Sequence, residues 1–161
     1  MADLVCNNAK GRFVELVRRV RANDPSTSGI VAIALAASGL EADDVLRDAD
    51  TFAALVSGTT NEATNTGIGR KVLTDTELAP YAPILDDSGN TYAVDYPDLV
   101  WATVANDGTG PIGKLVFCYD PDTTGGADTA LEPLSCHDFV VTPNGGQITA
   151  QMNAAGVARA G

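Results

Sequence analysis

The chain contains one histidine, His137, which is the first residue to consider for catalysis. Its neighbours Cys136 and Asp138 carry a thiol and a carboxylate, the groups that accompany histidine in nucleophilic enzymes. We expect these residues to lie on a β-strand, where adjacent side chains point to opposite faces, so Cys136 and His137 cannot act on each other. The sequence also lacks the short motifs of serine hydrolases, zinc peptidases, P-loop proteins and dinucleotide-binding proteins. We therefore expect His137 to be structural and the protein to have no enzymatic activity.

The acidic residues of the second half give no better catalytic pair. Most lie in turn-like segments, where Asp is favoured because it bonds to the local backbone. No two of them are marked by spacing or surroundings as a general acid and a general base.

One acidic segment has the spacing of a calcium-binding loop. If Asp120 is position 1, Asp122 and Asp128 fall at positions 3 and 9. Position 12 is Leu131 instead of a glutamate, and the preceding residues 114–119 are rich in strand-forming types instead of helical ones. The sequence favours a polar connection between two strands, with a calcium loop at Asp120, Asp122 and Asp128 as the alternative. We expect no other metal and no cofactor.

The three cysteines, Cys6, Cys118 and Cys136, form neither a CxxC motif nor an even set. This pattern is typical of reduced thiols in a cytoplasmic protein. Cys118 and Cys136 lie symmetrically about residue 127, so they could face each other across a hairpin and form a bond in an oxidising medium.

Charge is distributed unevenly along the chain. The net charge is -11, and residues 72–161 contain 12 acidic and 2 basic residues. This balance argues against nucleic-acid binding, which needs a basic surface. Basic residues cluster near the N-terminus, where we expect either a solvated helix face or a docking face for an acidic partner. The docking candidates are Arg12, Arg18, Arg19 and Arg21.

No segment is suited to crossing a membrane. The longest apolar run covers residues 29–40, which is too short to span a bilayer at roughly 20 residues. We also see no positively charged segment followed by an apolar stretch at the N-terminus, so we expect synthesis and folding in a cytoplasm.

Hydrophobic periodicity predicts the elements of the first half. Residues 8–21 have apolar side chains at helical spacing and end at Asp24-Pro25, although their alternation also permits a strand. Residues 29–37 are continuously apolar and indicate a buried strand. Residues 41–56 return to helical spacing, with a break expected at 48–51 and a stop at Gly58.

The second half consists of short strand-like runs separated by turns. The predicted strands cover residues 70–74, 91–95, 99–104, 114–119, 137–142 and 147–152. The turn Pro143-Asn144-Gly145-Gly146 is the strongest hairpin signal, because Asn-Gly readily adopts the positive φ angles of a tight turn. Such runs are typical of an antiparallel sandwich or barrel.

These elements predict a single α+β domain over residues 1–161. Its N-terminal arm, residues 1–8, is expected to be loose until it docks. Residues 9–66 supply helices and a strand, and residues 67–161 supply a predominantly antiparallel β-sandwich or barrel-like half.

Several stretches together resemble one family. They are 8–16, Asn23-Asp24-Pro25, 38–43, 50–55, 70–75, 118–126, Pro133-Leu134 and His137-Asp138-Phe139. The chain resembles the small virion structural proteins of tailed bacteriophages, many from phages of actinobacteria, and the similarity covers nearly its whole length.

The resemblance implies a non-enzymatic virion protein. The first expectation is a capsid decoration (minor capsid) protein on the capsid exterior, which binds the major capsid protein and stabilises the shell, with no membrane partner. The alternative is a minor tail or host-adhesion protein. We expect a symmetric homo-oligomer, most readily a trimer, because repeated copies add avidity to weak single contacts.

Overall fold

The central strand of the fold is β2 (Gly29–Ala36), which is buried along its entire length. The computed structural model describes residues 3–89, 91–153 and 156–160. In it, β2 pairs antiparallel with β7 (Ile112–Asp120) on one side and with β3 (Lys71–Leu73) on the other. A strand with neighbours on both sides and covered faces has no polar side to show, which explains its unbroken apolar sequence.

Within the described residues, the main sheet has five strands in the order β1-β8-β7-β2-β3, and all four pairings are antiparallel. A three-stranded sheet has the order β10-β5-β4, and a two-stranded ribbon joins β6 to β9. The remaining strands are β1 (Leu4–Val5), β4 (Ile84–Asp86), β5 (Thr91–Val94), β6 (Leu99–Trp101), β8 (Glu132–Val141), β9 (Ile148–Ala150) and β10 (Ala158–Ala160). The protein is therefore mixed α and β, with antiparallel strands.

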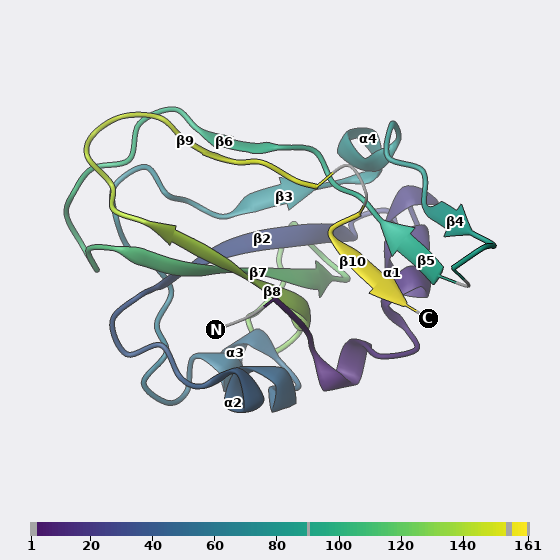
Figure 1. Cartoon of the computed structure of the whole chain (residues 1–161), viewed down its shortest axis with the longest axis horizontal. Helices are drawn as coiled ribbons and strands as arrows, with labels where there is room; N and C mark the ends of the chain where they lie inside the picture. Colours follow the sequence, from purple (N-terminus) through teal and green to yellow (C-terminus); the bar gives the residue numbers. More distant parts are fainter. Residues whose placement is uncertain (1–2, 90, 154–155, 161) are drawn as a thin grey trace.

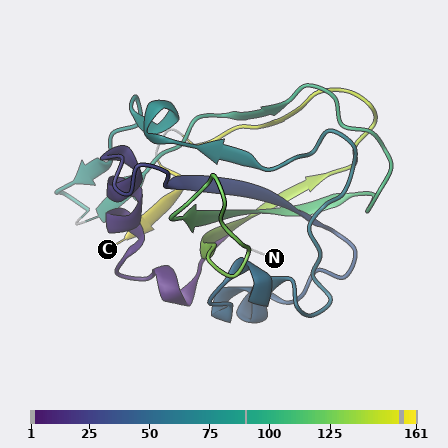
Figure 2. The same ribbon diagram turned by 180° about the vertical axis from the view of Figure 1, so that it is seen from behind.

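Different elements cover the two faces of the main sheet (Figures 1 and 2). The short helices α2 (Asp43–Asp48) and α3 (Phe52–Leu55) lie on one side, and the β6–β9 ribbon lies on the other. Trp101 fastens the ribbon, because its indole N–H donates to the carbonyl of Gly69 at 2.8 Å and its ring contacts Phe139. The core thus continues on both sides of β2 and β7.

A buried lysine links the first of these layers to the sheet. Lys114 on β7 is fully buried, and its Nζ lies 2.5 Å from Asp138 Oδ1 and 3.3 Å from Asp43 Oδ1. A buried ammonium is tolerated only when anionic partners surround it. These pairs therefore fix α2 against β7 and β8.

The helix α1 (Phe13–Arg21) follows the short 3-10 helix η1 (Asn7–Ala9). Its buried side chains are Phe13, Leu16, Val17 and Val20, so its charged positions face outward. It packs against α4 (Asp75–Leu78) and β5. As both views show, α1, α4, β4, β5 and β10 share one end of the molecule (Figures 1 and 2).

Most predicted elements match observed ones in position. The predicted strand over 29–37 corresponds to β2, and the break expected near 48–51 separates α2 from α3. The strand expected over 137–142 is longer, since β8 begins at Glu132. The strands β1, β4 and β10 and the helix α4 had no counterpart in the prediction.

The hairpin predicted at residues 143–146 is wrong. Gly145 does adopt a positive φ of 87°, but β9 pairs with β6 and not with β8. The turn instead bonds to Val104, whose N–H donates to Gly146 O and whose carbonyl accepts from Gly145 N–H. Of the two residues expected at positive φ, Gly145 has such an angle and Asn144 does not, and the partner of the departing strand is decided by distant residues.

Part of the N-terminal arm, which we expected to be loose, is paired with the main sheet. Leu4 and Val5 pair with Cys136 and Ser135 of β8, and Cys6 N–H donates to Leu134 O at 2.9 Å. Residues 1–2 of the predicted arm lie outside the described residues.

Candidate functional site

The end of α1 presents the basic residues that the sequence analysis selected. Arg18 and Arg19 are exposed, and in the described part of the chain no hydrogen bond or ion pair holds either guanidinium. Both lie in the last helical turn with Arg21, where cations complement the partial negative charge of the helix C-terminus. This position suits helix stability, and it also leaves two charges available to a partner.

A surface hollow of about 460 Å³ lies at this helix end. It is lined by Glu15, Arg18, Arg19, Arg21, Ala22 and Asp24. Arg21 differs from Arg18 and Arg19, because its Nη2 donates to the carbonyl of Ala79 at 3.3 Å. Arg21 thus ties α1 to the residue after α4, while the guanidinium groups of Arg18 and Arg19 share the hollow with the carboxylates of Glu15 and Asp24.

Arg12 does not belong to this group. It precedes α1, and its Nη1 lies 2.8 Å from Oε1 of Glu132 at the start of β8. The structure therefore brings three of the four predicted docking arginines together and assigns the fourth to an ion pair within the chain.

The three calcium-loop candidates are engaged in separate contacts. Asp120 Oδ1 accepts the N–H of Asp122, and Asp122 Oδ1 accepts from the N–H and hydroxyl of Thr124. Asp128 instead pairs with Arg70. Across residues 3–89, 91–153 and 156–160, no three carboxylate, thiol or imidazole side chains are grouped so that they could hold a metal ion. These bonds favour the polar-connection interpretation.

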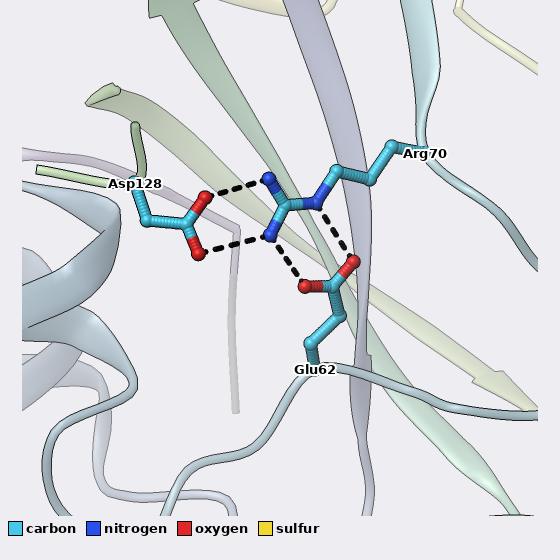
Figure 3. Close-up of polar contacts among 3 residues, drawn as sticks. All are labelled: Glu62, Arg70 and Asp128. Carbon is cyan, nitrogen blue, oxygen red and sulfur yellow. Dashed lines mark hydrogen bonds and ion pairs between the residues drawn. The ribbon is translucent and has the colours of Figure 1, made fainter. Parts of the chain in front are cut away.

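Arg70 forms a paired contact that the sequence analysis did not identify (Figure 3). Its Nε and Nη2 donate to Glu62 at 2.8 and 2.6 Å, and its Nη1 and Nη2 donate to Asp128 at 2.7 and 3.1 Å. The guanidinium also lies 5.0 Å from the ring centroid of Phe52. The hydrogen bonds from Arg70 lower the pKa of Asp128. These hydrogen bonds are all made within the chain. Arg70 therefore joins two loops to α3 and is not a candidate binding residue.

His137 lies in a line of polar groups whose order is that of a serine hydrolase triad. Its Nδ1 is 3.4 Å from Asp3 Oδ2, and its Nε2 is 3.0 Å from Ser135 Oγ. Burial lowers the pKa of His137, and the neighbouring Asp3 offsets part of that effect. Ser135 is fully buried, so a substrate cannot reach its hydroxyl in this arrangement. Ser135 and His137 are two residues apart on one strand, and this spacing predicts that their side chains lie on the same face. The contact of His137 with Asp3 joins distant parts of the chain, and no local pattern predicts it.

A cavity of about 220 Å³ lies beside His137, between the main sheet and the segment that follows β9. Its polar lining includes Asp3, His137 and Asp138, which already bond to one another or to Lys114 and Ser135. Its apolar lining includes Phe117 and Phe139.

All three cysteines are buried free thiols. Val116 stands opposite Cys136, and Pro133 stands opposite Cys118, so the two cysteines are not cross-strand partners. A hydrogen bond with Cys6, followed by burial, raises the pKa of Cys136, and burial raises the pKa of Cys118. Buried thiols with a raised pKa are poor nucleophiles, so Cys118 and Cys136 act as core residues.

Comparisons with known proteins found no matching family model, no matching curated protein and no matching solved structure. Among the described residues, no helix has the length and apolar character needed to cross a bilayer.

Proposed function

We propose that the protein is a bacteriophage capsid decoration protein that docks on the major capsid shell through the end of α1. The observation that supports this best is the pair of exposed, uncommitted guanidinium groups of Arg18 and Arg19 on a chain of net charge -11. Such a surface suits a partner with carboxylates, while the negative remainder keeps unbound copies apart. The resemblance of the sequence to small phage virion proteins supports the same function.

The proposal extends to assembly. A contact built on a few charges is weak for one copy, and symmetric repetition on a shell would multiply it. We propose a symmetric oligomer, with a trimer as the first choice, on the outside of the capsid. The finer fold prediction, a β-sandwich or barrel-like arrangement of the β-rich part, also stays a proposal.

Copy number on purified virions tests the assignment directly. Densitometry of this protein against the major capsid protein should give a simple fraction of the capsid subunit count. A handful of copies per particle would favour the minor tail or host-adhesion alternative. Absence from virions would refute both virion functions.

A charge-reversal variant tests the docking surface. Arg18→Glu/Arg19→Glu should leave the domain folded and should abolish most shell binding, because it repels the carboxylates that the wild type attracts. Arg21 is left in place because it contacts Ala79. Arg47→Glu on α2 makes the same replacement at one site, with half the charge change of the double variant, so it is the matched control for the single variants Arg18→Glu and Arg19→Glu and should bind as the wild type does. Equal binding by the Arg18→Glu/Arg19→Glu variant and the control would contradict docking through α1.

A further inference from the structure

A hollow of about 230 Å³ lies beside the connection from β7 to β8. Its apolar wall is made by Val31 of β2, Val72 of β3 and Leu131, which precedes β8. Val31 and Leu131 are buried and Val72 is 42% exposed, so this wall runs from the core to the surface. The volume is below that of most small-molecule pockets, and it suits one short side chain or a ligand of that size.

Asp120, the last residue of β7, lines this hollow with a carboxylate. Only 7% of the residue is exposed, and its Oδ1 accepts the N–H of Asp122 at 2.9 Å. Its Oδ2 accepts no hydrogen bond from the described residues, and it keeps some contact with solvent. Burying a carboxylate is costly unless hydrogen bonds or a cation compensate the lost hydration. Oδ2 is therefore placed to accept a bond from a donor that enters the hollow.

The arginine that lines the same hollow does not supply this bond. Arg70 directs its Nε, Nη1 and Nη2 to Glu62 and Asp128 (Figure 3). Within the described part of the chain, no ion pair joins Arg70 to Asp120. The single guanidinium is outnumbered by these three carboxylates, so the surroundings of the hollow attract a further cation.

Gly126 leaves space over the carboxylate of Asp120. A Cβ at residue 126 would lie 2.9 Å from Asp120 Oδ1 and 3.3 Å from Oδ2. It would also lie 2.6 Å from the carbonyl oxygen of Asp122, which is too close for any side chain. The turn thus keeps a residue without a side chain at the point where one would cover both oxygens.

We propose that this hollow binds a primary ammonium group on a short alkyl chain, as in a lysine side chain. The ammonium donates to Asp120 Oδ2, and the alkyl chain packs on Val31, Val72 and Leu131. An ammonium is a compact charge that one oxygen can hold, whereas the planar fork of a guanidinium is matched to two acceptors. This inference is independent of the decoration function.

The test follows the backbone amide signals of the full chain by NMR while n-butylammonium chloride is added at constant ionic strength. We expect the amides of residues 123–126 to shift with a dissociation constant of about 1–10 mM. Methylammonium should bind less tightly, because it lacks the chain that packs on the apolar wall. n-Butanol should also bind less tightly, because it has the chain without the charge.

Asp120→Asn is the decisive variant, and Asp122→Asn is its matched control. Each variant removes one negative charge, and each new amide oxygen can still accept the local N–H. Asp122 is exposed and does not line the hollow. We expect Asp120→Asn to weaken butylammonium binding about tenfold or more, and Asp122→Asn to leave it nearly unchanged. Melting temperatures report whether each variant is folded.

A second pair of variants tests the apolar wall and leaves Asp120 in place. Val72→Ser removes part of the wall, and Val100→Ser makes the same change at a residue that is 44% exposed on β6. Val72→Ser should reduce the advantage of butylammonium over methylammonium, and Val100→Ser should not. Equal effects of the two variants would contradict packing of the alkyl chain on this wall.

Two probes distinguish the sources of the ammonium group. Binding of Nα-acetyl-lysine N-methylamide at least as tight as that of butylammonium would assign the hollow to a lysine side chain of a partner protein. Weaker binding of the lysine derivative would assign it to a free amine.

Three results would overturn the proposal. Absence of saturable shifts at residues 123–126 would mean that the hollow binds no ammonium group. Equal weakening by Asp120→Asn and Asp122→Asn would mean general attraction to an acidic chain. Displacement of butylammonium by calcium chloride at a lower concentration than that of the amine would assign the hollow to a metal ion.

Discussion

At the residue scale, Arg70 joins parts of the chain that are far apart in sequence. It pairs with Glu62 in the preceding loop and with Asp128 in the loop before β8, and it covers Phe52 of α3. Charge-assisted, two-pronged bonds of this kind are stronger than ordinary surface ion pairs. The side chain therefore stabilises the loops around one face of the main sheet.

Replacing Arg70 should show this contribution and its pH dependence. We expect Arg70→Met to lower the free energy of unfolding at pH 7 by about 1–2 kcal/mol, a figure reduced for partial solvent exposure. The pKa of Asp128 is lowered in the folded state, so its part of the stability is present above its usual value of 3.8 and disappears as pH falls through the lowered folded pKa. Urea titrations followed by Trp101 fluorescence would measure the loss of unfolding free energy at pH 7 and its dependence on pH. A loss of unfolding free energy no larger than that caused by Arg18→Met would contradict this stabilising contribution of Arg70.

His137 should make the fold sensitive to mild acid. Its folded pKa lies below its unfolded value of about 6.5, so the unfolded chain takes up a proton first as pH falls. The contribution of His137 to stability should therefore decrease as pH drops below about 6.5 and become constant below its folded pKa. Thermal melts at stepped pH values would show this decrease in the wild type and its absence in His137→Gln. Identical slopes in the two proteins would contradict the assignment.

At the element scale, close approach of two loops depends on Gly67. Its φ is +94°, and a Cβ at this position would lie 1.9 Å from the carbonyl oxygen of Thr103. Ala105 N–H donates to Thr66 O at 2.9 Å beside this contact. The loop before β3 and the segment after β6 can meet only if residue 67 has no side chain.

A pair of glycine variants separates this contact from backbone strain. Gly110 has a φ of +75° with open space around it, so Gly110→Ala should cost about 1 kcal/mol from strain alone. Gly67→Ala adds a backbone clash and should cost several times as much. Chemical denaturation of both variants gives the comparison. Equal costs would mean that the two loops can separate freely.

The elements also show how far the sequence could be interpreted. The apolar run of β2 and the helical spacing of α1 depend on local pattern, so both were predicted. The strands β1 and β4 have two and three residues, and their pairing is set by partners elsewhere in the chain. The same limit explains the wrong hairpin after β8.

The candidate site divides in the same way. Arg18 and Arg19 were found because charge clustering is visible along the chain and survives folding on an exposed helix end. Arg12 pairs with Glu132, which is 120 positions away, and Arg70 pairs with Asp128, which is 58 positions away. No periodicity or composition contains that information.

At the scale of the whole molecule, net charge governs how copies meet. With a net charge of -11, free copies should repel at pH 7 in low salt. Light scattering should therefore give a positive second virial coefficient that decreases with added salt and as pH approaches the isoelectric point near 4.2. A negative coefficient at low salt and pH 7 would indicate attraction between copies and would contradict this account of solubility.

The strand order has a consequence for biosynthesis. The first strand, β1, pairs with β8, and the apolar β2 pairs with β7. A nascent chain therefore leaves one edge of β2 unpaired until residues 112–120 have left the ribosome, and the main sheet closes only after β8 has been made. Folding must be largely post-translational, because the strands that pair are far apart in sequence and pair slowly. During this time the apolar strand β2 is open to aggregation. Many copies made at once would then need either chaperones or prompt capture, and the acidic residues clustered in the later half of the chain would appear just when this protection is needed.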